Sequence, residues 1–154
     1  MTGRAPAPMT VADAQRIATA AHAGQFDKAG QPYILHPAYV ATLLRADGHS
    51  DDIVCAGWLH DAVEDTPLTL NDLRSFGASE TTVNAVDAVT RRDGETYMNM
   101  IRRAAADDGG RAVKLADNQH NSLESRLIRL EPADAKFLRV RYANARAVLL
   151  GGLP

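Results

Sequence analysis

The most constraining stretch of this chain runs from an apolar segment, residues 53–59, directly into a polar cluster. His60 and Asp61 follow the apolar segment, and Glu64 and Asp65 stand one turn further on. Because residues three and four apart share a face of an α-helix, one continuous helix would place Glu64 above both His60 and Asp61. Burying several charges in a core is costly unless a partner compensates them. The first interpretation of the stretch is therefore a site for a metal ion or a charged substrate.

The rest of the chain also has a helical pattern. Apolar residues recur at helical spacing, no segment longer than a few residues alternates as a strand does, and there is no internal repeat. Thr10, Ser50 and Ser79 precede such segments as N-caps, and glycines and prolines separate them. We expect helices over 11–23, 37–46, 51–66, 69–76, 80–89, 95–106 and 112–121, and a final helix from residue 132. The fold class predicted is all-α.

The length of 154 residues suits one domain with a core of its own. Residues 1–9 hold two prolines and no apolar signal core, which indicates a flexible tail before a single domain over residues 10–154. The one cysteine, Cys55, excludes an intramolecular disulfide and a cysteine-based zinc site. It stands in the apolar segment, so we expect a buried, unreactive thiol.

The formal net charge of −2 gives no general attraction to nucleic acid or to a membrane surface. An anionic ligand must then be held by a local cluster of cations. No run of apolar residues is long enough to span a bilayer. We expect a cytoplasmic protein whose partner is neither a nucleic acid nor a membrane, and the sequence does not indicate an oligomeric state.

Candidate metal ligands lie in three separate segments: His36, the pair His60 and Asp61, and Asp117. Two imidazoles and two carboxylates suit Mn²⁺, Fe²⁺ or Zn²⁺ better than Ca²⁺ or Mg²⁺. Such an ion polarises a phosphoryl group and lowers the pKa of bound water from ~15.7 toward ~7. Taken singly, His36 is an ordinary helix-end hydrogen-bonding group and Asp117 an ordinary surface carboxylate. Only their combination indicates a metal site.

The remaining acidic and histidine residues have other expected roles. Glu64 and Asp65, one turn beyond the metal pair, are placed to position a water molecule or to move its proton. His22, His49 and His120 are not expected to be ligands, and for His120 a structural role and a substrate role are both open.

Three segments carry a resemblance to a known family. The segments AHAGQFDKAGQPYILHP (21–37), LHDAVEDT (59–66) and VKLADNQHN (113–121) resemble successive motifs of the HD-domain alarmone hydrolases, which are the RelA/SpoT-type enzymes and their small stand-alone relatives. The likeness covers roughly residues 10–125. It implies an HD-domain helical bundle with a single metal site.

The resemblance also implies a ligand set and a reaction. Mn²⁺ would be bound at the positions of His36, His60, Asp61 and Asp117, and an acidic pair would activate the attacking water. That pair falls on Glu64 and Asp65. The implied reaction is hydrolysis of the 3′-pyrophosphate of guanosine tetra- or pentaphosphate, which releases pyrophosphate and leaves GDP or GTP. Nothing after the hydrolase-like region is long enough for a second catalytic domain, so we expect a hydrolase alone.

Substrate contacts carry over less completely. Lys28 and Asn121 match positions that line the substrate pocket in this family. The segment from residue 90 to residue 97 resembles one in small bacterial members, which makes Arg91 and Tyr97 further candidates for substrate binding, although a solvated arginine and a half-buried tyrosine are the ordinary alternatives.

Two departures leave the substrate open. The family usually has an arginine that packs against guanine where this chain has Asp27, and the residues after the third motif, 122–124, also differ. A carboxylate at position 27 would repel phosphates. The alternatives are therefore the same metal chemistry on an adenine alarmone, NADPH or another nucleotide, or a nucleotide-binding HD module without catalysis.

Overall fold

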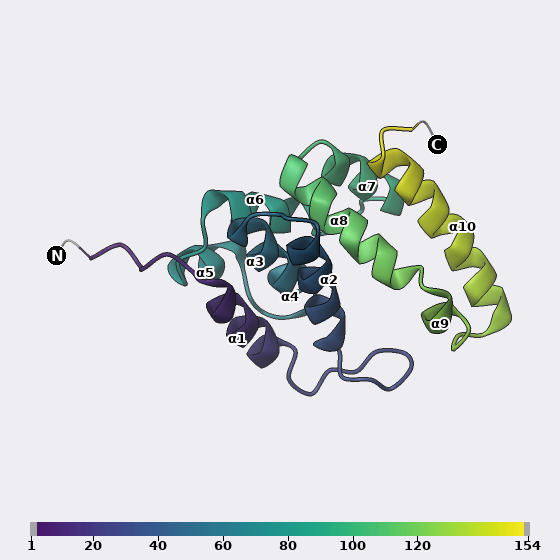
Figure 1. Cartoon of the computed structure of the whole chain (residues 1–154), viewed down its shortest axis with the longest axis horizontal. Coiled ribbons are helices and arrows are strands. Elements are labelled where there is room, and N and C mark those ends of the chain that lie inside the picture. The colour runs from purple at the N-terminus through teal and green to yellow at the C-terminus, as the bar shows by residue number, and fades with distance from the viewer. Residues whose placement is uncertain (1–2, 153–154) are drawn as a thin grey trace.

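The computed structural model describes residues 3–152, and helices form its framework (Figure 1). The helices are α1 (Val11–Ala21), α2 (Leu35–Ala46), α3 (Asp51–Leu59), α4 (Ala62–Asp65), α5 (Leu70–Ser75), α6 (Glu80–Val89), α7 (Tyr97–Ala105), α8 (Asp108–Asn121), α9 (Glu124–Leu127) and α10 (Pro132–Leu149). Within residues 3–152 the β contact is one isolated bridge between Phe26 and Pro32. The all-α prediction is confirmed.

Helix α3 lies at the centre of the bundle. It packs against α1, α2, α6 and α8, and its residues Ala56 and Leu59 have no exposed surface. Cys55 is buried here as expected, and burial raises the pKa of its thiol to about 11. Helices α7 and α10 pack on α8 on the far side of the bundle from α1 (Figure 1). The apolar segment of the sequence thus forms the core that the other helices surround.

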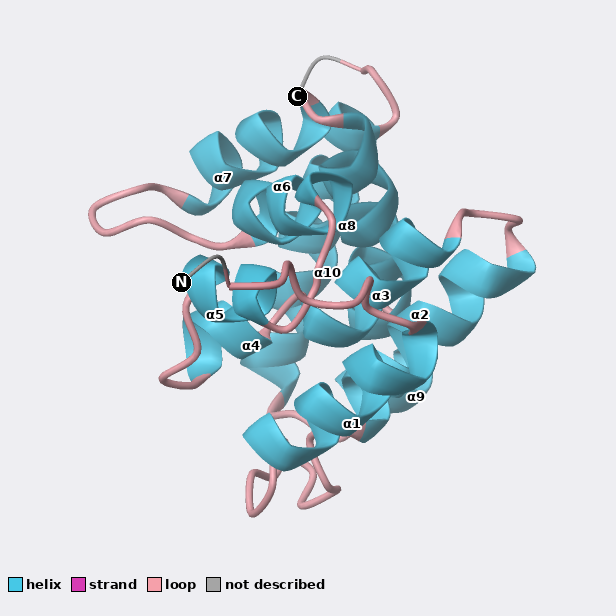
Figure 2. Cartoon of the chain, turned by 90° about the vertical axis from the view of Figure 1, so that its left-hand side faces the viewer, coloured by secondary structure: helices cyan, strands magenta, loops and turns pink. Residues whose placement is uncertain are grey.

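The chain before α1 is largely exposed and has no regular structure between residues 3 and 8 (Figure 2). At Met9 the backbone N–H donates to the carbonyl of Gly77, which follows α5, at 2.9 Å. Residues 1, 2, 153 and 154 of the expected tail and domain lie outside the described residues. Among residues 3–152, no helix is both long and apolar enough to cross a bilayer.

Two predicted helix boundaries differ from the structure by more than two residues. The first is at residues 107–110, which were expected to separate two helices but belong largely to α8, because the side chain of Asp107 accepts from the N–H of Gly110 as an N-cap. The glycines permit close packing: a Cβ on Gly110 would lie 2.6 Å from the Cβ of Ala88 on α6. The two glycines therefore let α8 pack closely against α6, and they do not end the helix.

The second error concerns the central stretch, which was expected to form one helix to residue 66. Instead α3 ends at Leu59, and α4 begins after a turn at His60 and Asp61. In a continuous helix the carbonyl of Gly57 would accept the N–H of Asp61. Instead, Nδ1 of the His60 imidazole forms a hydrogen bond of 2.7 Å with the carbonyl oxygen of Gly57. The helix therefore breaks at the two residues expected to bind the metal.

Gly57 sets the distance between α2 and α3. A Cβ added at this position would lie 2.6 Å from Cδ1 of Leu44 and 3.2 Å from the backbone of Ala41. We expect Gly57→Ala to lower the free energy of unfolding by about 1–3 kcal/mol, because overpacking must displace α2. Urea denaturation measures this loss.

Thr42→Ala, at an exposed position on the same helix α2, is the matched control, and its effect should stay within about 0.5 kcal/mol. Equal stability of the two variants would show that α2 and α3 are not closely packed at Gly57.

Candidate metal centre and active site

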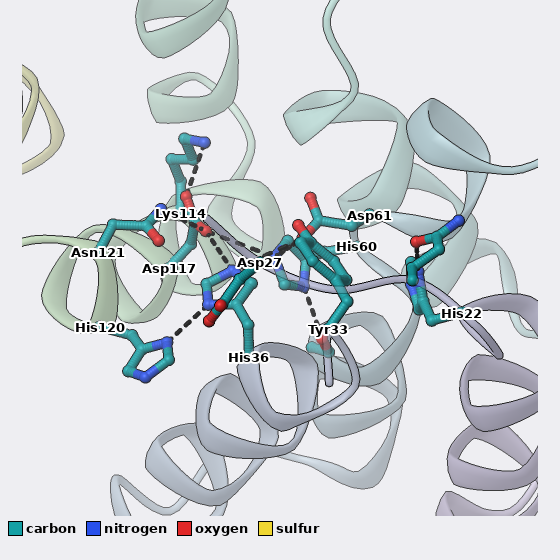
Figure 3. A network of polar contacts seen from close by, with 12 residues as sticks. His22, Asp27, Tyr33, His36, His60, Asp61, Lys114, Asp117, His120 and Asn121 are labelled. Carbon is teal, nitrogen blue, oxygen red and sulfur yellow. Dashed lines mark hydrogen bonds and ion pairs between the residues drawn. The ribbon is translucent and has the colours of Figure 1, made fainter. Parts of the chain in front are cut away.

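Four side-chain atoms from three parts of the fold meet at one point. They are Nε2 of His36 on α2, Nε2 of His60 at the end of α3, Oδ2 of Asp61 in the turn, and Oδ1 of Asp117 on α8 (Figure 3). His36 Nε2 lies 2.9 Å from Asp117 Oδ1 and 3.2 Å from His60 Nε2, which is 3.0 Å from Asp61 Oδ2. The structure thus brings together the four residues proposed as ligands.

The turn after α3 allows the side chains of the adjacent residues His60 and Asp61 to face the same point. On a regular helix the side chains of His60 and Asp61 would diverge, because successive residues are rotated by about 100°. The break turns both toward α2 and α8. His60 and Asp117 are buried, and Asp61 is partly so.

The two imidazoles are oriented as metal ligands. Nδ1–H of His60 donates to the carbonyl of Gly57, which leaves the lone pair on Nε2. Nδ1 of His36 lies 2.6 Å from Nδ1 of His120, so its Nε2 also faces the centre. Burial lowers the pKa of His120 to about 4, with the cation Arg126 adding to the effect, and a neutral His120 can accept from His36.

A cation fits this set of donors. The lone pairs of His36 Nε2 and His60 Nε2 would face each other at 3.2 Å, and two carboxylate oxygens lie beside them. Two nitrogens and two carboxylate oxygens match Mn²⁺, Fe²⁺ or Zn²⁺ chemistry. The residues present therefore fit a transition-metal ion.

The two carboxylates are held by neighbouring donors. The hydroxyl of Tyr33 donates to Oδ2 of Asp61 at 2.7 Å, and the amide of Asn121 donates to Oδ1 of Asp117 at 3.0 Å. Lys114 forms an ion pair with Oδ2 of Asp117 at 2.7 Å. Burial disfavours the lysine charge, but the Asp117 carboxylate outweighs it and raises the pKa of Lys114. These contacts fix the orientation of both carboxylates.

The acidic pair lies on α4, on the exposed side of the metal centre. One carboxylate oxygen each from Asp61, Glu64 and Asp65 lies within 4.8 Å of the others. Glu64 and Asp65 are exposed as residues, so the burial expected for the cluster holds for His60 and in part for Asp61. Partial burial of the Asp65 carboxyl raises its pKa to about 6, and the charges of Asp61 and Glu64 add to this.

The loop between α6 and α7 contacts the acidic pair through its backbone. The N–H of Arg91 donates to Oε1 of Glu64 at 2.8 Å. Arg103 on α7 secures this loop: it donates to the carbonyl of Thr90 at 2.7 Å and pairs with Glu95 at 2.8 Å. The orientation of Glu64 therefore depends on α7 as well as on its own helix.

A cavity of about 580 Å³ opens over the metal centre. Its floor includes His36, Asp61 and Asp117, and its walls come from the loop before α2 and from α8, α9 and α10. Glu64 lines this cavity and also a second, more open one of about 710 Å³ beside the loop that follows α6. Glu64 thus stands where the two spaces meet, and Asp65 lines the second one.

The proposed substrate-binding residues divide between these spaces. Lys28 and Asn121 line the main cavity, and Arg91 lines the second one beside Glu64 and Asp65. Tyr97 lines neither space but a separate hollow of about 340 Å³, where the guanidinium of Arg141 stacks on its ring at 4.1 Å.

Comparison with known proteins places this arrangement in a family. A family model described as HD domain matches residues 14–126. This range includes the four converging candidate ligands and the acidic pair. The chain belongs to the HD-domain family.

Relatives of this HD domain include much longer proteins. This chain is 38% identical over 133 residues to "GTP pyrophosphokinase" of Streptomyces coelicolor. The aligned region covers 80% of this chain and 16% of that protein. The chain is also 40% identical over 118 residues to "Guanosine-3′,5′-bis(diphosphate) 3′-pyrophosphohydrolase" of Haemophilus influenzae, covering 68% of this chain and 17% of that protein. The chain therefore spans about a sixth of the length of these relatives.

Solved structures show the same fold. One is described as a metazoan ortholog of SpoT that hydrolyzes ppGpp and plays a role in starvation responses; it superposes with a TM-score of 0.78 at 22% identity, over 97% of this chain and 89% of that one. The lmo0812 protein of Listeria monocytogenes gives a TM-score of 0.53 at 24% identity, over 79% of this chain and 98% of that one. At these identities the likeness concerns the fold alone.

Several residues of this HD domain's site were not assigned from the sequence. Tyr33 and His120 contact the candidate ligands Asp61 and His36, and Arg103 secures the loop against Glu64. Tyr33 and His120 lie within the segments 21–37 and 113–121 that resemble the family motifs, and this position in the sequence could have identified them as site residues. Nothing local marks Arg103, because its partners lie on α6 and in the following loop.

Proposed function

We propose that this HD domain is a Mn²⁺-dependent phosphohydrolase that removes the 3′-pyrophosphate from guanosine tetra- or pentaphosphate. The observation that carries the proposal is that a two-nitrogen, two-carboxylate centre and Glu64 lie at one cavity, with a carboxylate oxygen of Asp65 within 4.8 Å of those of Asp61 and Glu64. Relatives that carry the name of a 3′-pyrophosphohydrolase support this choice of substrate.

His36, His60, Asp61 and Asp117 would hold the ion, which when bound supplies charge to polarise a phosphoryl oxygen and acidify a water molecule. Glu64 is suited to accept the proton of the attacking water, since its side chain lines the cavity over the metal centre and the N–H of Arg91 fixes its orientation. Asp65, whose pKa is raised to about 6, is suited to hold a proton for the leaving oxygen.

The proposed reaction is an ordinary hydrolysis. The water oxygen bonds to the phosphorus attached to the 3′-oxygen, the bond between that phosphorus and the 3′-oxygen breaks, and the 3′-oxygen takes up a proton. Lys28, exposed at the cavity wall, and Lys114, partly buried beside Asp117, supply positive charge toward the phosphates. The products are pyrophosphate and GDP or GTP.

The test is an assay of purified protein with Mn²⁺ and guanosine tetraphosphate. We expect release of pyrophosphate and GDP, and loss of this activity when a chelator removes the metal. Protein without added metal is the control. Intact substrate after long incubation with the Mn²⁺-loaded protein would rule out the proposed substrate.

A second candidate function is the same chemistry on another nucleotide, which the carboxylate of Asp27 in the cavity wall favours. The same assay should be run with the adenine counterpart of guanosine tetraphosphate, which carries the same 3′-pyrophosphate, and with NADPH. Released phosphate and pyrophosphate should be measured separately. If either compound is hydrolysed faster than guanosine tetraphosphate, that compound becomes the proposed substrate. Tight nucleotide binding without turnover under any divalent metal would identify a binding module.

A further inference from the structure

His22 is a buried histidine that lies outside the candidate metal centre. It follows the last residue of α1 with 2% of its surface exposed, and it lines neither the main nor the second cavity. Its Nδ1 lies 2.8 Å from Oε1 of Gln25. Its Nε2 is buried and has no hydrogen-bond partner within residues 3–152. A buried ring nitrogen without a partner costs free energy, so stability alone does not explain an imidazole at this position.

Gln25 connects this histidine to the helix that carries the acidic pair. Its Nε2 donates to the backbone carbonyl of Asp65 at 3.2 Å, where α4 ends. Because a carbonyl oxygen can only accept, the amide nitrogen of Gln25 faces Asp65 and the amide oxygen faces His22. Nδ1 of His22 is therefore the donor in its bond with Gln25. The imidazole thus fixes which way the Gln25 amide is turned.

The backbone of Gln25 is also held in place. Its N–H donates to the carbonyl of His22 at 3.0 Å, and its carbonyl accepts the N–H of Tyr33 at 2.9 Å. Gly24, between His22 and Gln25, has a φ of +78°, which a residue with a side chain rarely adopts, and this turn brings Gln25 back to the histidine. The Gln25 amide therefore reaches α4 from a loop of defined shape.

Helix α4 depends on contacts of this kind because it is short. A helix of four residues has too few internal hydrogen bonds to hold its own orientation. The last carbonyls of a helix also lack partners within it, and Gln25 supplies a donor for that of Asp65. The N–H of Arg91 holds the neighbouring Glu64 from the loop after α6. The acidic pair is thus held by two segments that are distant in sequence.

The ring of His22 has a second contact, with Tyr33. The ring centroids lie 5.0 Å apart, and the hydroxyl of Tyr33 donates to Asp61 (Figure 3). The contact with Tyr33 depends on the shape of the ring, whereas the contact with Gln25 depends on the N–H of the ring. Substitutions can therefore separate the two contacts, since phenylalanine keeps the ring and asparagine keeps an N–H donor.

We propose that His22, acting through Gln25, is a positioning residue for Glu64 and Asp65. Its Nδ1–H turns the Gln25 amide toward α4, and this contact holds the two carboxylates beside the candidate metal centre. The inference rests on the proposed function in so far as it assigns these carboxylates to the proposed hydrolysis. It gives the buried histidine a role in the rate of the reaction and not in binding the metal or the nucleotide.

The test compares two substitutions of His22 that should have opposite effects. His22→Phe keeps a ring against Tyr33 and removes the donor. We expect its kcat with guanosine tetraphosphate to fall by about 10–100-fold, because a displacement of about 1 Å at the reacting groups has an effect of this size. KM and metal content should not change, and the midpoint of urea unfolding should be equal or higher, because the unpaired nitrogen is gone.

His22→Asn has the complementary design. It places an amide N–H near the position of Nδ1 and leaves a gap beside Tyr33. The urea midpoint should therefore fall, because packing is lost. The donor to Gln25 remains, so kcat should recover most of what His22→Phe loses.

Gln25→Met tests the intermediate link. It keeps the length of the side chain and removes both hydrogen bonds, so it should lower kcat as His22→Phe does. Combining the two substitutions should cause no further loss, because both break the same chain of contacts. His49→Phe is the matched control, since His49 lies between α2 and α3 and lines neither cavity. It should keep the kcat and KM of the unchanged protein.

Two outcomes of the kinetics would overturn the proposal. One is a normal kcat in His22→Phe or in Gln25→Met. The other is a parallel loss of kcat and urea midpoint in both substitutions of His22, which would show that the histidine supports the fold and has no separate effect on the acidic pair.

Hydrogen exchange followed by mass spectrometry tests the positioning without turnover. His22→Phe should speed exchange at the N–H groups of Asp65 and Thr66, which donate to the start of α4, and leave α6 and α8 unchanged. If it does so while the unchanged protein leaves guanosine tetraphosphate intact, the proposed function fails and the positioning role stands. If the unchanged protein hydrolyses guanosine tetraphosphate while exchange and kcat of His22→Phe are normal, the positioning role alone fails.

Discussion

Asp61→Asn is expected to remove the metal and with it the activity, lowering kcat by about 10³-fold or more, since a bound metal contributes several kcal/mol to such a reaction. The amide keeps the size of the side chain and can still accept from Tyr33. It removes the negative charge that lies 3.0 Å from His60 Nε2 and 3.5 Å from His36 Nε2. Two imidazoles and one carboxylate then hold the ion less tightly.

Metal content of the desalted protein, measured by plasma mass spectrometry, and release of pyrophosphate check this prediction together. Asp51→Asn is the control, because Asp51 is an exposed carboxylate at the start of α3, the helix that ends before Asp61, and pairs with Arg45. It should keep the metal and the rate of the unchanged protein. An Asp61→Asn protein that retained both would show that Asp61 is not a ligand.

Glu64→Gln is expected to have the opposite signature, with the metal retained and kcat lowered by about 10²–10⁴-fold. Glutamine has the same shape and keeps an oxygen for the N–H of Arg91, so the loop after α6 should stay in place. What it loses is the ability to accept a proton from water. KM should change little, because the substrate is bound elsewhere in the cavity.

Steady-state kinetics and metal content distinguish this variant from Asp61→Asn. Glu131→Gln, an exposed carboxylate that precedes α10, is the matched control and should match the unchanged protein in both measurements. Normal turnover by Glu64→Gln would remove Glu64 from the mechanism. Loss of the metal from this variant would instead make Glu64 a ligand.

Helices were predictable because their signals are local. Thr10, Ser50 and Ser79 each cap the helix that was expected to follow them, and the final helix begins at Pro132. The failures have a common cause in contacts with other segments. Gly109 and Gly110 look like a break but lie within α8, because α6 packs closely against them.

The central stretch shows the same division. That His60 and Asp61 are chemically out of place in an apolar segment is evident from residue types alone. The break of the helix at these residues is not evident from the sequence, because it depends on a hydrogen bond from the His60 side chain to the carbonyl of Gly57. Without the break the two side chains could not face the same point.

For the candidate metal centre, residue identity and spacing were sufficient to name the chemical groups, because imidazoles and carboxylates are side chains that bind transition-metal ions. Their meeting depends on packing, since His36 and Asp117 are 81 residues apart and are joined only where α2 lies against α8. Asp27 gives the clearest contrast. Its charge alone predicts repulsion of phosphates, whereas the fold directs one oxygen to its own loop and the other toward Arg126 on α9. Composition and local pattern specify which groups a chain carries, but the partner of each buried group is set by elements distant in sequence.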